Sequence, residues 1–480
     1  MRWIALTAWA GLLFWYGLSG PLYRTESLRA IIGQSALDGD WLYPTLYGEP
    51  FLTKPPGTYV AIGLASLPFG RVTERSARVP TALAATLVLL FVYGTFRRFV
   101  GENRAFVIAL LMPVSVLWLD KAPSAEIDML QLAWVTTALC CFLRAYAAKE
   151  EGRPALGWWI AALVCVTGGF LTKWTAPAFF YLTVGPFLVW RRRTRWLVSF
   201  DHLFAAFVAV GLCAAWATSV AERVGWPALL DTVGREAAQR FAPKAVGKPY
   251  PWVESLTFPL VVLAAMVPWS IPAACGLARR PEHWDPLTQL LHCWAWPNLL
   301  FWSLPAQHNV RYVLPVAPAV AALGILTCCR WAERGAHVVT PRRALLAVVV
   351  AWAVAKVAFV EAVVPARTAG RDAAPTAGEL SRLVPDGEML YLCKLKDEGV
   401  MFYYGRPARR FDPARLPDRP FLALLIAQEW EARDRLGNVE LIAELTDQQK
   451  APLYLVRVRP AESESWPPSR RTRTSSPSAP

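Results

Sequence analysis

Residues 80–96 read PTALAATLVLLFVYGTF, and this stretch decides the class of fold. It contains no charged side chain and approaches the roughly 20 apolar residues that a helix needs to cross a bilayer. Arg97 and Arg98 follow it directly, and a second apolar run, residues 105–119, begins after Arg104. Long apolar runs that alternate with short basic loops are typical of a polytopic membrane protein.

The same alternation extends over most of the 480 residues, of which 55% are hydrophobic and 23 are Trp. A lipid-facing segment must satisfy its own backbone hydrogen bonds, so we interpret each long apolar run as a helix. Eleven runs qualify: 3–18, 80–96, 105–119, 129–146, 156–171, 176–190, 203–220, 256–277, 287–304, 310–329 and 344–364. The predicted fold is mainly α, a transmembrane helical bundle of about 11 to 13 spans.

The net charge of +14 comes from Arg residues in short clusters between the apolar runs, without a basic stripe and interleaved aromatic residues. This pattern indicates membrane topology and excludes nucleic acid as a partner. Most of the nine Cys lie inside apolar runs, with neither a disulfide framework nor zinc-ligand spacing. We therefore assign no metal ligand and no cofactor. The first run lacks a small-residue cleavage site after it, which favours an uncleaved span.

The basic loops predict the orientation, because Lys and Arg collect on the cytoplasmic side of a membrane. If all eleven runs cross, one side holds Arg2 and the clusters at 97–104, 149–153, 191–195, 279–280 and 330–343. We expect this side to be the cytoplasm, so the N-terminus of this multi-pass cell (inner) membrane protein is cytoplasmic. The outer side then holds the first external loop 21–79, the turn 120–128 and everything after Pro365.

Two stretches are expected to fold outside the spans. Residues 57–69 are apolar but too short to cross, which favours an amphipathic juxtamembrane helix in the first external loop. Beyond residue 365, short apolar strands at 389–392 and 453–458, with a helical stretch at 421–436 between them, predict a small α/β domain.

Three regions follow from these expectations. Residues 1–365 form the membrane domain, and residues 366–460 form the small domain, which lies outside the cytoplasm. Residues 461–480 are Ser, Pro, Thr and Arg with almost nothing to bury, so this tail is expected to be disordered.

The first external loop carries the motifs that point to a function. It reads YRTESLR at 23–29, GDWLYPTLYGEP at 39–50 and KPP at 54–56. These residues resemble the lipid-carrier-dependent (GT-C superfamily) glycosyltransferases, in the branch of the aminoarabinose transferases of lipid A and the family 39 protein O-mannosyltransferases. Weaker similarity extends over about the first 330 residues, in AEIDML (125–130), FLTK (170–173), KPY (248–250), PWS (268–270) and RYVLP (311–315).

The resemblance implies an inverting transfer of a sugar from a polyprenyl-phosphate donor to a membrane lipid or protein acceptor on the outer face. Such a transfer requires a carboxylate near the acceptor nucleophile and cations that neutralise the departing phosphate. Glu26 and Asp128 each lie beside a span at the same membrane surface and are the candidate catalytic carboxylates. The candidate substrate- and phosphate-binding residues are Lys54, Arg29, Lys173, Arg311, Tyr312 and His308.

The chain departs from the family at its first motif. Members carry an Asp-Glu pair where this sequence has Thr25-Glu26, so the usual catalytic Asp is absent. Either Glu26 or Asp128 has taken over its role, or the activity is altered or lost. If the activity is lost, the protein is an inactive relative that still binds the carrier lipid.

The carboxylates and cations also have ordinary structural explanations. Glu26 could complement a helix dipole, and Asp128 could cap the following span with Glu126 as its solvated neighbour. Lys173 and Arg311 could be interfacial anchors that snorkel to the headgroups.

Ionisable residues also occur within the last span. Lys356 and Glu361 lie there, where such residues are costly and usually functional, although both are close enough to a helix end to snorkel. A transporter or lipid flippase remains a further alternative. Such proteins tend to show repeated halves and charges at mid-membrane, and neither is evident here, because the charges gather on one face.

Overall fold

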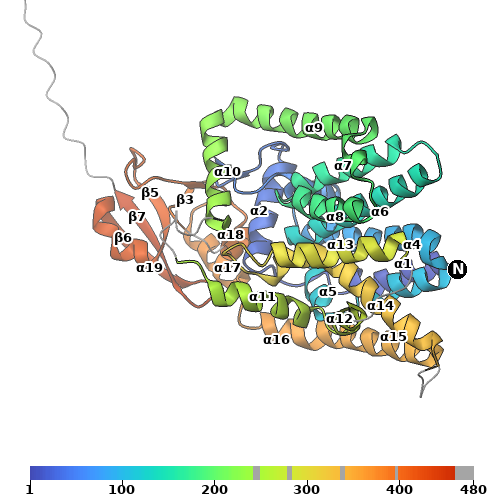
Figure 1. Cartoon of the computed structure of the whole chain (residues 1–480). Coiled ribbons are helices and arrows are strands. Elements are labelled where there is room, and N and C mark those ends of the chain that lie inside the picture. The colour runs from blue at the N-terminus through green and yellow to red at the C-terminus, as the bar shows by residue number, and fades with distance from the viewer. Residues whose placement is uncertain (242–248, 278–283, 336–340, 395–397, 460–480) are drawn as a thin grey trace, which may run out of the picture. The chain divides into compact units, whose positions relative to one another are not determined.

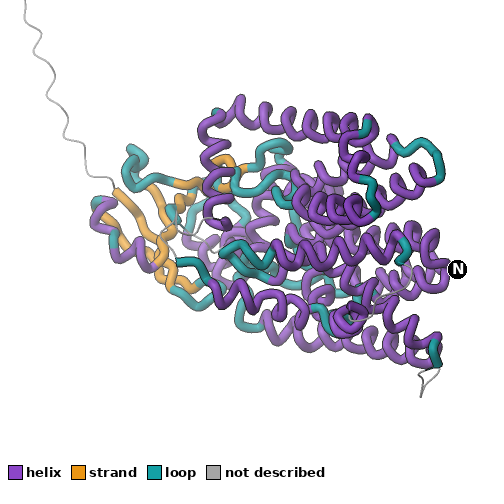
Figure 2. Tube along the Cα trace, in the orientation of Figure 1, coloured by secondary structure: helices purple, strands orange, loops and turns teal. Residues whose placement is uncertain are grey.

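A computed structural model describes residues 1–241, 249–277, 284–335, 341–394 and 398–459 (Figure 1). The chain forms two compact units, Met1–Asp372 and Ala373–Pro480. Helices dominate the first unit, whereas the longer strands belong to the second (Figure 2). Lys248, Arg279, Arg280 and the tail 461–480, which entered the sequence predictions, lie outside the described residues.

The first unit is a helical bundle around one continuous apolar core. Its principal helices are α1 (Arg2–Ala10), α2 (Thr25–Leu37), α3 (Gly57–Ser66), α4 (Glu74–Leu111), α5 (Val116–Lys121), α6 (Ile127–Glu150), α7 (Leu156–Phe170), α8 (Ala176–Trp190), α9 (Phe200–Val224), α10 (Trp226–Phe241), α11 (Trp252–Ala265), α12 (Ser270–Leu277), α13 (Pro286–Phe301), α14 (Ala317–Glu333), α15 (Pro341–Ala358) and α16 (Val364–Thr368).

Helix α6 lies inside this bundle, in contact with α4, α7 and α8 (Figure 1). Its Phe142 packs edge to face against Trp159 of α7 and Phe180 of α8, with ring centroids 5.3 and 6.1 Å apart. Edge-to-face contacts add to the stabilisation that the rings gain from burial. The N-terminal end of α6, which carries Asp128, is therefore attached to a rigid part of the core.

Each predicted apolar run is mainly helical, but the helices differ in length and some runs are interrupted. Five helices are long and apolar enough to cross a membrane by themselves: Glu74–Leu111, Ile127–Glu150, Phe200–Val224, Val310–Glu333 and Arg342–Thr368. This count covers the described residues only, and α3, α7 and α8 are shorter apolar helices. The predicted run 80–96 lies in the first arm of α4, which turns at Gly101, whereas the predicted run 105–119 is divided between the second arm of α4, which ends at Leu111, and α5.

One predicted span needs correction. Residues 256–277 were expected to form a single crossing helix, but the structure divides them into α11 and α12, which meet at 118°. Pro268 stands at the break. Proline has no N–H for the helix ladder and disfavours helical backbone in the residue before it, so the helix ends there.

The first external loop is folded onto the bundle as a layer of its own. It contains α2, the short strands β1 (Thr45–Leu46) and β2 (Glu49–Pro50), and α3, which continues as a 3₁₀ turn to Phe69. The N–H of Gly57, at the start of α3, donates to the Leu171 carbonyl 2.7 Å away. A Cβ at Gly57 would lie 2.8 Å from the same oxygen. The Lys54-Pro55-Pro56 motif is thereby held next to the turn that carries Lys173.

The second unit contains a five-stranded mixed sheet of order β4-β3-β5-β7-β6. Its elements are α17 (Ala374–Leu383), β3 (Leu390–Leu392), α18 (Glu398–Tyr404), β4 (Ala408–Arg410), β5 (Phe421–Ile426), α19 (Ala427–Glu431), β6 (Asn438–Thr446) and β7 (Pro452–Arg459). The strands expected at 389–392 and 453–458 are β3 and β7. The helix expected over 421–436 is wrong in its first half, because residues 421–426 form the central strand β5. A short, continuous apolar run is typical of a strand that is buried on both faces.

Candidate active site

A buried ion pair joins the start of α6 to the turn after α7. The Nζ atom of Lys173 lies 2.7 Å from Oδ1 of Asp128, and both side chains are 2% exposed. The same Nζ lies 4.7 Å from the centre of the Tyr312 ring, which adds a cation–π contact. A buried pair requires good geometry to offset desolvation, and these contacts provide it.

Arg311 comes to the same place from a distant part of the chain. It lies in the 3₁₀ helix Val310–Val316, whose first turn is capped by the Asn309 side chain, which accepts from the Arg311 N–H at 3.1 Å. Its Nη1 lies 3.5 Å from Oε1 of Glu126, and its Nε lies 4.0 Å from Oδ2 of Asp128. Two cations and two carboxylates therefore converge at the start of α6.

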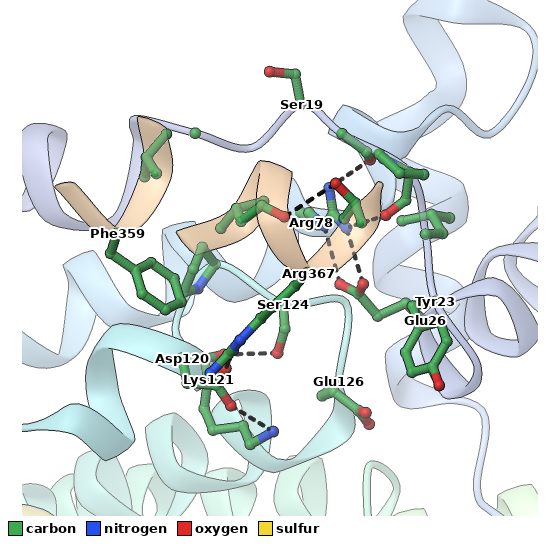
Figure 3. Close-up of a pocket in the computed structure, with 18 of the residues that line it drawn as sticks. Ser19, Tyr23, Glu26, Arg78, Asp120, Lys121, Ser124, Glu126, Phe359 and Arg367 are labelled. Carbon is green, nitrogen blue, oxygen red and sulfur yellow. Dashed lines mark hydrogen bonds and ion pairs between the residues drawn. The ribbon is translucent and has the colours of Figure 1, made fainter. Parts of the chain in front are cut away.

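Glu26 is held in a different arrangement. Its two carboxylate oxygens accept from Nε and Nη2 of Arg78 at 3.0 and 2.9 Å (Figure 3). Oε1 also accepts the backbone N–H of Ala125 at 2.8 Å. A bidentate Arg–carboxylate pair is strong and geometrically specific. Glu26 thus fastens the start of α2 to α4 and to the turn before α6, and these bonds occupy both of its oxygens.

Glu126 is the carboxylate that the sequence interpretation missed. It was expected to be a solvated neighbour of a helix cap, but it is only 7% exposed and makes no side-chain cap bond to α6. The Thr25 hydroxyl donates to its Oε1. Its Oε2 is buried and has no hydrogen-bond partner among the described residues. Thr25 therefore lies against a carboxylate from another loop.

Glu126 also lines a cavity of about 350 Å³ in the helical unit. The walls come from residues 17–26, Arg78, residues 120–126 and the segment 356–371 at the end of the last span. Figure 3 shows Glu26 facing Arg78, and Asp120 beside Lys121 and Arg367. A pocket of this volume is at the lower end of the range that binds small molecules, so it admits a headgroup or a sugar.

Two of the remaining predicted cations lie outside this cluster. Lys54 forms an ion pair with Glu236 of α10. Arg29 is 6% exposed and donates to the Tyr59 hydroxyl at 3.4 Å, and burial raises the pKa of this phenol. Neither cation lines the cavity.

His308 makes its contacts with residues outside the cluster. Its Nε2 donates to the Ser303 carbonyl at 3.0 Å, and its ring packs on Phe258 with centroids 4.8 Å apart. Within the described ranges, no group of three or more His, Cys, Asp or Glu side chains could hold a metal ion.

Comparison with known proteins connects this chain to a family. Residues 53–218 match the model described as dolichyl-phosphate-mannose-protein mannosyltransferase. The undecaprenyl phosphate-alpha-4-amino-4-deoxy-L-arabinose arabinosyl transferase of Pseudomonas paraeruginosa is 30% identical over 333 residues, which are 67% of this chain and 58% of the relative. The protein of the same name from Erwinia tasmaniensis is 25% identical over 309 residues, 63% and 54% of the two chains. The chain thus spans little more than half the length of these relatives.

Solved structures share the fold over a longer stretch. The crystal structure of ArnT from Cupriavidus metallidurans bound to undecaprenyl phosphate matches with a TM-score of 0.74 at 18% identity, over 95% of this chain and 97% of ArnT. The archaeal oligosaccharyltransferase AglB from Archaeoglobus fulgidus, in complex with an inhibitory peptide and a dolichol-phosphate, matches with a TM-score of 0.51 at 14% identity. That match covers 85% of this chain and 63% of AglB.

The fold is that of the lipid-carrier glycosyltransferase class, and the chain is a multi-pass membrane protein. Within this class, the predicted resemblance to the aminoarabinose transferase type is confirmed. The sequence similarity covers two thirds of the chain, and the structural similarity covers nearly all of it.

Proposed function

We propose that this protein transfers a sugar from a polyprenyl-phosphate donor to a lipid acceptor in the membrane. The names of the sequence relatives and the undecaprenyl phosphate in the ArnT structure support this donor class. The observation that carries the proposal is the convergence of Glu126, Asp128, Lys173 and Arg311 from three separate segments. This cluster combines two cations with a carboxylate, Glu126, whose Oε2 has no hydrogen-bond partner among the residues that the structure describes. The transfer requires both kinds of group.

The proposed reaction assigns one task to each side of the cluster. Glu126 accepts the proton of an acceptor hydroxyl while the oxygen of that hydroxyl bonds to the anomeric carbon. The bond from this carbon to the phosphate oxygen breaks on the opposite face, so the configuration is inverted. Its electron pair goes to the phosphate, whose negative charge Arg311 and Lys173 stabilise.

Glu26 and Asp128 act as positioning residues in this scheme. Glu26 fixes the turn that presents Glu126, and Asp128 orients the Lys173 ammonium. Lys54 and Arg29 lie farther along the first external loop, where they bind the phosphate group or the carrier chain before transfer. Tyr312 supports Lys173 through its ring.

The cavity is proposed to open on the outer face of the cytoplasmic membrane. At the other ends of the spans, the exposed ion pairs Arg98–Glu151 and Arg104–Glu333 connect loops rich in basic residues. The positive-inside rule assigns such loops to the cytoplasm. The N-terminus is then cytoplasmic, and the domain after residue 372 is extracytoplasmic.

The test compares Glu126→Gln with a matched control, Glu333→Gln, in the full-length protein reconstituted in lipid nanodiscs. The donor is a polyprenyl-phosphate sugar labelled in the sugar, and both transfer to lipid and release to water are measured. Loss of the general base is expected to lower turnover by about 100-fold or more, with donor binding retained. Glu333→Gln is expected to keep the wild-type rate. Wild-type turnover in Glu126→Gln would remove the catalytic assignment.

A second candidate function follows from Thr25. A chain without the family Asp could bind the carrier lipid and not transfer the sugar. The same assay separates the two functions, because donor binding without turnover in the wild-type protein would favour the carrier-binding function.

A further inference from the structure

The segment 190–200, WRRRTRWLVSF, connects α8 to α9 and combines basic with exposed apolar side chains. Together with Asp201 it carries four arginines and one carboxylate, an excess of three positive charges. Trp190, Val198 and Phe200 are 47%, 71% and 71% exposed. Helix α9 begins at Phe200 and can cross a membrane, and only 17% of its most apolar stretch is buried inside the protein. The segment therefore lies where a lipid-facing span begins, at the depth of the lipid headgroups.

The segment is attached firmly to the end of α6. Nε of Arg191 donates to the Tyr146 hydroxyl at 2.7 Å. Nζ of Lys149 donates to Oγ of Ser199 at 3.2 Å and to Oδ2 of Asp201 at 2.9 Å. Because these bonds fix both ends of the segment, a ligand can bind here without first ordering the backbone, which lowers the entropic cost of binding.

Two arginines of the segment have no protein partner. Arg193 is paired, since its Nε lies 2.9 Å from Oε1 of Glu150. The side chains of Arg192 and Arg195 are exposed and make no hydrogen bond or ion pair with any residue in the described part of the chain. Their guanidinium groups are therefore available to an anion at the membrane surface.

The backbone at Arg192 is a second and independent observation. The N–H of Arg192 donates to the Val189 carbonyl at 3.0 Å, and the N–H of Arg193 donates to the Leu188 carbonyl at 2.8 Å, so α8 ends in a Schellman motif. The left-handed residue of this motif is usually glycine, but here it is Arg192, with φ +55°. Strained residues of this kind cluster at functional sites. Since the turn itself favours glycine, the Arg192 side chain has a function other than ending the helix.

We propose that Arg192 and Arg195 bind the phosphodiester headgroup of an anionic phospholipid, whose acyl chains contact the three exposed apolar side chains of the segment. Guanidinium groups match the geometry of phosphate oxygens, and the adjacent apolar surface favours a lipid over a soluble anion. The site lies at the opposite end of α6 from Asp128, so it is independent of the proposed sugar transfer. With the orientation proposed above, the lipid belongs to the cytoplasmic leaflet, whose surface is negatively charged.

The test titrates dioleoylphosphatidylglycerol into the full-length protein in a zwitterionic detergent and counts bound lipids by native mass spectrometry. The comparison probes are dioleoylphosphatidylcholine, which has the same chains and no net charge, and inorganic phosphate. The variants are Arg192→Gly, Arg192→Lys and the double variant Arg192→Gly/Arg195→Gln. The matched control is Arg342→Gln/Arg343→Gln, which removes two exposed cations at the start of α15.

Wild type and the control are expected to bind one phosphatidylglycerol that neither phosphatidylcholine nor inorganic phosphate displaces. The double variant is expected to weaken this binding about tenfold or more, because each basic residue near an anionic headgroup strengthens binding about fivefold. Arg192→Lys is expected to retain most of the affinity. Arg192→Gly is expected to bind the lipid more weakly, yet to unfold without lipid at the wild-type temperature or above it, because glycine suits the left-handed backbone.

Four results would overturn the proposal. Unchanged phosphatidylglycerol affinity in the double variant would remove the site, and an equal loss in the control would assign the binding to overall charge. Displacement of the lipid by inorganic phosphate at an equal concentration would assign the site to a soluble anion. A lower unfolding temperature of Arg192→Gly without lipid would make the Arg192 side chain a structural element of the turn.

Discussion

Replacing Asp128 by Asn tests whether the buried ion pair holds the site together. In the wild-type protein, the Asp128 carboxylate lies 2.7 Å from the Lys173 ammonium, and both side chains are 2% exposed. The variant removes this negative charge and leaves the ammonium buried. Breaking one partner of a buried pair costs about 3–5 kcal/mol, much of it the desolvation of the remaining charge. The helical unit is large, so we expect the unfolding temperature to fall by on the order of 5 °C.

The double variant Asp128→Asn/Lys173→Met removes both charges and is expected to recover a large part of this loss. Tryptophan fluorescence during thermal unfolding in a single detergent follows the transition. The matched control is Glu333→Gln, which breaks the exposed pair with Arg104, separated by 2.6 Å. Exposed pairs contribute about 0–1 kcal/mol. The reasoning is refuted if Asp128→Asn costs no more than Glu333→Gln, or if the double variant is as unstable as the sum of the two single variants.

Three further outcomes are expected. Burial, and then the nearby Glu429 carboxylate, raise the pKa of the Cys393 thiol from 9.0 to about 11, so the thiolate fraction at pH 8 is about 100-fold below that of an unperturbed thiol. The rate at which maleimide labels Cys393 is therefore expected to rise with pH up to about 11, and a plateau of this rate near pH 9 would contradict the prediction. Gly33→Ala would place a Cβ 2.5 Å from Ile62 and is expected to destabilise the α2–α3 layer by about 1–3 kcal/mol in thermal unfolding, whereas Gly157→Ala, with nothing within 4 Å of the added Cβ, is expected to be tolerated. Thr25→Val removes the hydroxyl that donates to Glu126 but keeps the shape, so a lower rate of sugar transfer with unchanged donor affinity is expected; an unchanged rate would show that the hydroxyl does not orient Glu126.

The carboxylates show where sequence reasoning worked and where it failed. Asp128 and Lys173 were both named from motifs 45 residues apart, and they form one ion pair. Glu126 was passed over because an acidic residue beside a helix start is usually a solvated cap neighbour. Its burial and its contacts with Thr25 and Arg311 come from segments about one hundred or more residues away, which no local pattern reports.

The prediction of a helix at residues 421–426 failed for a different reason. FLALLI is as compatible with a buried helix as with a buried strand, because a continuous apolar run has no periodicity that distinguishes them. Pairing with β3 on one side and β7 on the other decided the outcome. Lys356 is similar, since its sequence position fits a snorkelling side chain equally well, and only the packing of the last span shows that its ammonium is buried.

The sequence by itself determined the membrane class, the helical runs and the motifs of the glycosyltransferase family, because length, hydropathy and charge act locally along the chain. The tertiary structure alone decided which acidic group has an oxygen without a hydrogen-bond partner in the described part of the chain, which cations surround that group, and which ammonium lines the cavity. Those properties depend on distances between side chains that are far apart in sequence, and electrostatic energies depend on such distances and on burial.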